Sequence, residues 1–214
     1  MEIETVTEHF TRADGSYLFA RWGRPIAPTV FGVDDATLQV VKGACEAMVA
    51  LAGHQMTDAD PELGSNLMWF FFREWDDLLD VPNLDQLVPD LVALVGRLQD
   101  SDANQYRIFR FDEMRAIRAA FVFIRMDKHL SDVPADALAL SQMLQVILLW
   151  SDTAFANRSP LLRDTKTGAT VLRPEIAAIV RAGYDLALPA VTDDRSHGMR
   201  LGARVGLLLA EDQQ

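Results

Sequence analysis

The sequence contains a single cysteine, Cys45, in 214 residues. One thiol can form neither an internal disulfide bond nor a cysteine-cluster zinc site. Cys45 lies in an apolar helical pattern, so we expect a buried, unreactive thiol and not a nucleophile. The histidines are His9, His54, His129 and His197, and no two of them could be presented by one helical turn. We therefore predict no metal-ligating residue and no metal cofactor.

Basic residues are also scarce. Lysine and arginine number 20 against 31 acidic residues, which gives a formal net charge of −11. A surface of this sign repels nucleic-acid phosphates and anionic lipid, so neither is an expected partner. The acidic residues are concentrated between Thr57 and Asp102. We interpret this concentration as a solvated surface, with a docking surface for a basic partner as the alternative.

Long apolar runs and targeting signals are missing as well. No stretch reaches the ~20 apolar residues that a membrane-spanning helix needs. The amino-terminal segment "MEIETVTEHFTRADG" has neither the basic nor the apolar region of a signal peptide. These features predict a soluble, cytoplasmic protein, and the oligomeric state stays open.

Local catalytic motifs are absent too. The chain has no Gly-x-Ser-x-Gly nucleophile elbow, no phosphate-binding Gly-x-x-x-x-Gly-Lys loop and no dinucleotide fingerprint after a strand. The acidic pairs Asp34–Asp35 and Asp76–Asp77 point their side chains in diverging directions, so helix capping is their expected role. We predict no catalytic and no cofactor-binding residue.

Apolar patterns predict one α+β domain spanning residues 1–214, with a mixed sheet packed against helices. "NLMWFFF" (66–72) is continuously apolar, which is typical of a central strand covered on both faces. "IRAAFVFIRMD" (117–127) predicts a second strong strand, whereas "DANQYRIFRFDE" (102–113) fits either an exposed strand or a loop. The other expected elements are short strands at 17–22 and 28–33, helices at 34–52, 84–100, 174–188 and 196–210, and a loop at 157–174.

The least polar long stretch is "DALALSQMLQVILLW" (136–150). Pro134 and Asp136 are typical of a helix start, so we expect a buried central helix over 134–150. Ser141, Gln142 and Gln145 are its uncharged polar residues. We expect them to bond to nearby backbone or to each other inside the core. The functional alternative places them on the floor of a cleft.

Several segments, in their order along residues 8–200, resemble a bacterial family of unknown function described as lipoproteins, with a zincin-like (metallopeptidase-like) fold. The segments that carry the resemblance are "HFTRADGSYLFARWGRPIAPTVFGV", "LAGH" with "SNLMWFFF", "IRAAFVFIRMD" with "LALSQMLQVILLWSDT", and "YDLALPAVTDDRSHGM". Where the family has an acidic pair before a glutamine, this chain has Leu138 and Ala139, and only Gln142 and the later Asp152 remain. The family's usual export signal is missing. The resemblance implies a zincin-like fold but argues against hydrolysis, because a metal hydrolase without its base and a ligand is nearly inactive.

These observations predict a non-catalytic, degenerate zincin-like protein, a pseudo-metallopeptidase that binds a peptide or protein partner, for example along an edge strand. The alternatives are a metal-dependent peptidase or hydrolase with dispersed ligands such as His129 and His197, and a small-molecule binding protein. We expect Asp152 to cap a turn, Tyr184 to lie in the core with its hydroxyl at the surface, and His197 to lie in an exposed loop. The candidate cleft residues are Ser141, Gln142, Gln145, Asp152, Tyr184 and His197.

Overall fold

The computed structural model describes residues 3–212 and has a four-stranded mixed sheet at its centre. The strand order is β2–β3–β5–β4, with β2, β3 and β5 parallel and β4 antiparallel to β5 at the edge. The bounds are β2 (Pro28–Phe31), β3 (Leu67–Phe72), β4 (Gln105–Phe111) and β5 (Ile117–Arg125). The two strongly apolar segments are therefore the two inner strands; the central position of 66–72 was predicted, and 117–127 was predicted as a strand. The ambiguous segment 102–113 contains the edge strand.

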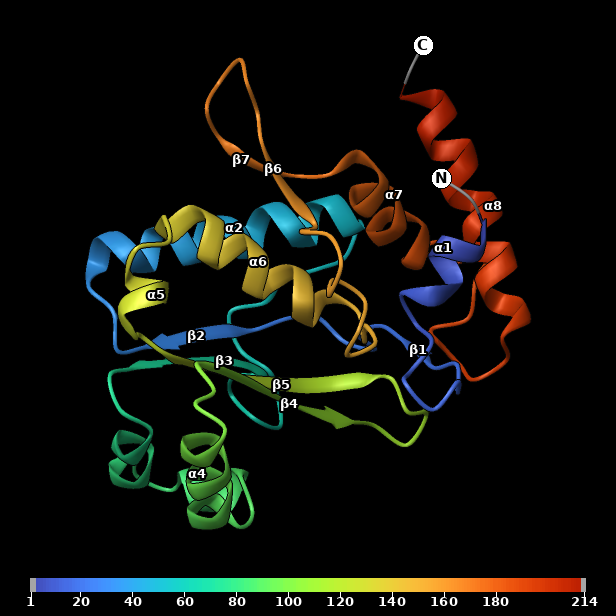
Figure 1. Cartoon of the computed structure of the whole chain (residues 1–214). Coiled ribbons are helices and arrows are strands. Elements are labelled where there is room, and N and C mark those ends of the chain that lie inside the picture. Colours follow the sequence, from blue (N-terminus) through green and yellow to red (C-terminus); the bar gives the residue numbers. More distant parts are fainter. Residues whose placement is uncertain (1–2, 213–214) are drawn as a thin grey trace.

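One face of the sheet is covered by α2 (Asp35–Ala52), α5 (Lys128–Ser131) and α6 (Ala135–Ile147) (Figure 1). The start and end of α2 agree with the sequence: the Asp34 side chain accepts a hydrogen bond from the Thr37 amide, and Gly53 ends the helix with a left-handed φ of 63°. Cys45 on α2 is fully buried, as expected. The helix α6 is buried too, but it ends three residues before Trp150, because Leu148 is extended and forms a bridge with Arg21.

The opposite face of the sheet packs against a smaller group of helices (Figure 1). These are the 3₁₀ helix η1 (Trp75–Asp80), α3 (Leu84–Leu87) and α4 (Leu91–Asp100). The prediction of one helix over 84–100 is wrong, because Val88 is extended and Asp90 has a positive φ of 57°. Pro89 lies between them, and proline lacks an N–H and disfavours the helical conformation of the preceding residue.

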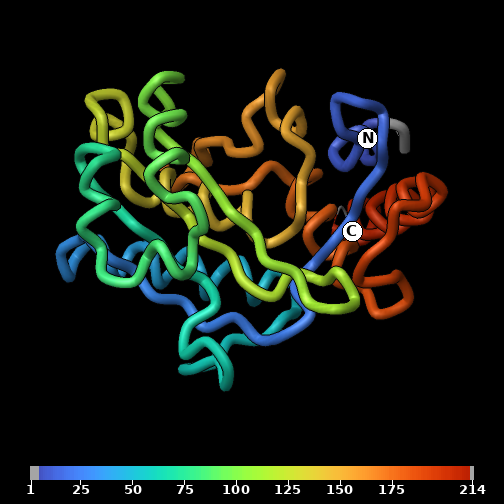
Figure 2. Tube along the Cα trace, turned by 90° about the horizontal axis from the view of Figure 1, so that it is seen from below, coloured from blue at the N-terminus to red at the C-terminus, as the bar shows by residue number. Residues whose placement is uncertain are grey.

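The remaining elements come from the amino-terminal segment and from the part of the chain after α6. The predicted loop 157–174 instead contains a hairpin of β6 (Leu161–Arg163) and β7 (Thr170–Leu172). The others are α1 (Ile3–Glu8), β1 (Phe19–Ala20), α7 (Pro174–Gly183), β8 (Val191–Thr192) and α8 (Ser196–Glu211), with β1 antiparallel to β8. The amino-terminal segment and α8 lie on the same side of the molecule (Figure 2). No helix within residues 3–212 is long and apolar enough to cross a membrane.

Candidate functional site

The edge strand β4 presents different side chains to its two sides. Tyr106 and Ile108 pack into the smaller core beneath the sheet. Gln105 and Arg107 alternate with them and contact Gln142 on α6. This period of two is the geometry of a β-strand, in which successive side chains point to opposite faces. The strand therefore carries two polar side chains to the carboxyl-terminal half of α6.

Gln142 joins these two side chains in a closed hydrogen-bonded cluster. Its Nε2 donates to Gln105 Oε1 at 2.6 Å, and its Oε1 accepts from Arg107 Nη2 at 2.8 Å. Arg107 Nη2 also donates to Gln105 Oε1 at 3.0 Å. Gln142 is 1% exposed, so its amide would be costly to bury without these partners. We call Gln105, Arg107 and Gln142 the arginine–amide cluster.

The positive charge of Arg107 has no acidic partner in this cluster. Burial lowers the pKa of Arg107 to about 10, so the guanidinium is still charged at neutral pH. Within residues 3–212, no carboxylate lies at ion-pair distance from it, and its buried Nε has no hydrogen-bond partner. An uncompensated, partly buried cation of this kind is unfavourable for folding and favourable for binding an anion.

The cluster borders a groove with a volume of about 670 Å³. Its walls come from β4, from the end of α6 and from the loop that follows α6. The lining residues are Arg12, Gln105, Tyr106, Arg107, Phe109, Phe111, Gln145, Leu149, Trp150, Ser151, Asp152, Phe155 and Ala156. A smaller apolar hollow of about 220 Å³ shares Phe111 and Leu149 with the groove. The groove therefore offers the half-buried cation of Arg107 next to aromatic and aliphatic walls, with the exposed Arg12 as a second cation.

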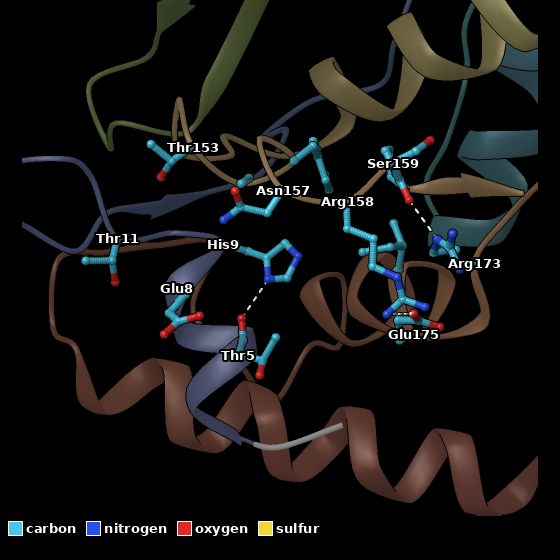
Figure 3. A pocket seen from close by; sticks show the side chains of 14 residues that line it. Thr5, Glu8, His9, Thr11, Thr153, Asn157, Arg158, Ser159, Arg173 and Glu175 are labelled. Carbon is cyan, nitrogen blue, oxygen red and sulfur yellow. Dashed lines mark hydrogen bonds and ion pairs between the residues drawn. The ribbon is translucent and has the colours of Figure 1, made fainter.

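A second cavity, of about 490 Å³, lies on the other side of the loop after α6 and shares Phe155 with the groove. Figure 3 shows His9 pointing into this cavity, with Arg158 and Glu175 opposite. Burial lowers the pKa of His9, and its Nδ1 is 2.6 Å from the Thr5 carbonyl oxygen. Arg158 pairs with Glu175 at 3.0 Å. The charges of Arg158 and Glu175 therefore compensate each other, in contrast to the charge of Arg107.

The structure brings some of the predicted cleft residues together at the groove. Gln142 belongs to the arginine–amide cluster, and Gln145 and Asp152 line the groove. Ser141 is half-buried and does not line it. The expected partners of Gln142 are corrected: they are side chains on β4, and neither backbone nor the other polar residues of α6. Asp152 is exposed and makes no side-chain hydrogen bond within the described residues, so the expected turn cap is absent there.

Tyr184 and His197 lie away from the groove, and both expectations about their exposure are wrong. The Tyr184 hydroxyl is buried and donates to the Ile147 carbonyl oxygen at 2.8 Å. His197 is fully buried in the first turn of α8, with Nδ1 at 2.7 Å from the Tyr17 hydroxyl. The adjacent Gly198 allows this burial, because a Cβ there would be 2.3 Å from Thr7 Oγ1 on α1.

The residues considered for a dispersed metal site are not assembled in this part of the chain. His129 is exposed on α5, whereas His197 is in the core. Within residues 3–212, no group of three or more histidine, cysteine or acidic side chains is arranged to hold a metal ion. The described residues therefore offer no ligand set for the dispersed hydrolase.

The functional residues that the sequence analysis missed are Gln105 and Arg107. Their signal is the alternation of polar and apolar residues in 105–108, which fits an edge strand with one face under a helix.

Comparisons with known proteins found no matching family model, no matching curated protein and no matching solved structure. The groove and its side chains are therefore the basis on which a function can be inferred.

Proposed function

We propose that this protein is a non-catalytic, zincin-like binding module that holds an extended peptide segment along β4. The observation that carries the proposal is the free backbone edge of β4 beside the groove. The Asn104 carbonyl oxygen accepts a hydrogen bond from the Arg125 amide on the β5 side at 2.9 Å. In an antiparallel pair such residues alternate with residues whose backbone groups point away from the partner strand. The backbone groups of Gln105, Arg107 and Phe109 therefore face outward.

An added strand is a recurring way for sheets to bind peptides, with backbone hydrogen bonds providing affinity and pockets providing specificity. Within residues 3–212, β4 pairs only with β5, which leaves its other edge available at Gln105 and Arg107; the Phe109 carbonyl oxygen accepts a hydrogen bond from Arg110 Nη1 at 3.4 Å. The adjoining groove and the apolar hollow at Phe111 would receive alternate side chains of the peptide. Edge and pockets thus lie side by side, which is the arrangement that strand addition requires.

The order of elements supports the zincin-like part of the proposal. In metallopeptidases of this kind, a buried helix presents two metal ligands one turn apart. Here α6 follows β5, and Leu138 and Gln142 have the matching spacing of four residues. The strand bordering the groove is β4. Leu138 is an apolar core residue, and the Gln142 amide is occupied by a guanidinium in place of a metal ion.

The proposal is tested with random peptides displayed on phage, using the wild-type protein as bait. Enriched peptides are synthesised in two N-methylated series, one methylated at odd positions and the other at even positions. We expect one series to lose about tenfold or more in affinity, because only alternate amides of an added strand face β4. Binding should also slow hydrogen exchange of the Gln105, Arg107 and Phe109 amides.

Three results would contradict the proposal. The first is a failure to enrich any peptide above protein-free beads, and the second is equal binding of both methylated series. The third is cleavage of a bound peptide, detected by mass spectrometry after incubation with the protein and added zinc. Intact peptide in that assay is the expected result.

A further inference from the structure

We infer that the groove recognises a carboxylate group of its ligand through Arg107, with an apolar group of the same ligand against the aromatic walls. The inference rests on the proposed function, since it names the chemical group that a bound peptide must present. The anchoring residue lies in the arginine–amide cluster.

Arg107 has no carboxylate as a counter-charge within the described residues. Several other arginines in the described chain meet carboxylates, for example Arg24 at 3.2 Å from Asp60 and Arg125 at 2.6 Å from Asp102, whereas Arg21 bonds to a backbone carbonyl oxygen. Arg107 is given only the neutral amide oxygens of Gln105 and Gln142. A buried ion is stabilised by a partner of opposite charge, so an incoming anion would gain from this site.

The Arg107 guanidinium also has free hydrogen-bond donors. All hydrogen bonds that Arg107 makes within the described residues come from Nη2. Nη1 is therefore a free donor, and the buried Nε also has no partner. A guanidinium donates through several N–H groups in a fixed plane, which matches the oxygens of a carboxylate. The two glutamines hold this plane in place before a ligand arrives.

The charge of the chain and the apolar walls of the groove favour a carboxylate over a phosphate. Arg12 and Asp152 both line the groove and offset each other's charge, whereas the whole chain carries a net charge of −11. This net charge penalises a dianion more than a monoanion. The walls formed by Phe109, Phe111 and Trp150 favour an apolar group beside the carboxylate. An acidic side chain next to an aromatic residue, or an aromatic residue at a peptide's carboxyl terminus, has this combination.

The small-molecule probe is 3-phenylpropanoate, which joins a carboxylate to an aromatic ring. Its binding is followed through the Nε–Hε signal of Arg107 in ¹⁵N nuclear magnetic resonance spectra. We expect a saturable shift with 3-phenylpropanoate, and about tenfold or weaker binding of the neutral 3-phenylpropanamide and of phenyl phosphate. Equal binding of the amide, or stronger binding of the phosphate, would overturn the inference.

Protein variants test the same contact from the other side. Gln142→Glu gives Arg107 a carboxylate of its own and should reduce 3-phenylpropanoate affinity by about tenfold or more. Gln99→Glu is the matched control, because Gln99 is exposed on α4 and does not line the groove. Its effect should stay within about threefold, the range of a screened surface charge. Wild-type affinity in Gln142→Glu, or an equal loss in both variants, would refute the contact.

The failure of this inference can be told apart from the failure of the proposed function. If peptides bind along β4 with unchanged affinity after their acidic groups are converted to amides, the carboxylate inference is refuted and the peptide-binding proposal stands. The reverse result is saturable 3-phenylpropanoate binding at Arg107 with no enriched peptide. In that case the carboxylate inference stands and the peptide-binding proposal is refuted.

Discussion

Two polar clusters are buried against the same sheet, and they differ in how their charge is balanced. Next to β2 and β3, Asn66 donates to the Pro25 carbonyl oxygen and to Asp60 Oδ2, and accepts from the Ala27 amide at 2.8 Å. Arg24 completes this group through its ion pair with Asp60. We call it the aspartate cluster. At β4, the arginine–amide cluster contains a cation and two neutral amides.

The difference shows in the acidic member of the aspartate cluster. Burial alone would raise the pKa of Asp60. The Leu63 and Glu62 amides and the Arg24 guanidinium outweigh that effect and hold the pKa below its usual value. The aspartate cluster is thus complete and ties the start of β3 to the segment before β2. The arginine–amide cluster is incomplete and borders a groove. Completeness therefore distinguishes a structural polar cluster from a candidate binding cluster.

The largest effect is expected from Asn66→Ala. This change removes three hydrogen bonds and leaves the Ala27 amide and the Pro25 carbonyl oxygen without their side-chain partner, whereas Asp60 keeps its contact with Arg24. The free energy of unfolding should fall by about 3 kcal/mol, measured by urea denaturation. Asn157→Ala, at an exposed asparagine, is the control and should stay within about 0.5 kcal/mol of wild type. Equal effects of both changes would show that the aspartate cluster is not a structural tie.

His197 is a buried base that, unlike Arg107, can lose its charge near neutral pH. Burial lowers the pKa of His197 to about 4. In the unfolded chain histidine has a pKa of about 6.5, so between these values the unfolded state binds more protons. Stability from the neutral imidazole is therefore complete above pH 6.5 and is lost as the pH falls towards 4. Between pH 7 and 4.5 the wild type should lose about 2 kcal/mol more than His197→Gln.

Urea denaturation at several pH values measures this difference, and His129→Gln, at an exposed histidine, should follow the wild-type curve. Parallel curves for wild type and His197→Gln would mean that His197 is not held neutral. Arg107 differs from His197 because its lowered pKa still lies well above neutral pH.

Effects no larger than this are expected from removing the arginine of each cluster. Arg24→Met leaves Asp60 buried without its cation and should cost about 2 kcal/mol of unfolding free energy. Arg107→Met removes a charge that has no partner, which offsets the loss of its hydrogen bonds to Gln105 and Gln142, so the change should lie within about 1 kcal/mol of zero. Chemical denaturation at pH 7 compares the two variants. A larger cost for Arg107→Met than for Arg24→Met would reverse the distinction between the clusters.

Much of the fold could be predicted because its signals are local. The continuous apolar run of β3 and the β-branched and aromatic run of β5 identify inner strands from a few neighbouring residues. The start of α2 depends on a side chain three residues from its partner amide, at Asp34. The helix break at Pro89 was missed because a proline is also tolerated in the first turn of a helix.

The candidate site could be predicted only in part because its contacts are distant in sequence. Gln142 is visible as a polar residue in an apolar helix, but its partner Arg107 is 35 residues away. Their contact depends on which face of β4 lies beneath α6, and strand register does not follow from composition. The burial of His197 likewise depends on α1, which packs against α8 at Gly198.

The lone thiol of α2 gives the molecule a built-in reporter. Cys45 is fully enclosed between helix and sheet, and this enclosure raises its pKa to about 12, which keeps it protonated and inert. A thiol-labelling reagent added to the intact protein can therefore react only when α2 separates from the sheet. The labelling rate reports how often these openings occur. A ligand in the groove stabilises the closed state and slows labelling, so its binding is followed without attaching a probe to the groove itself.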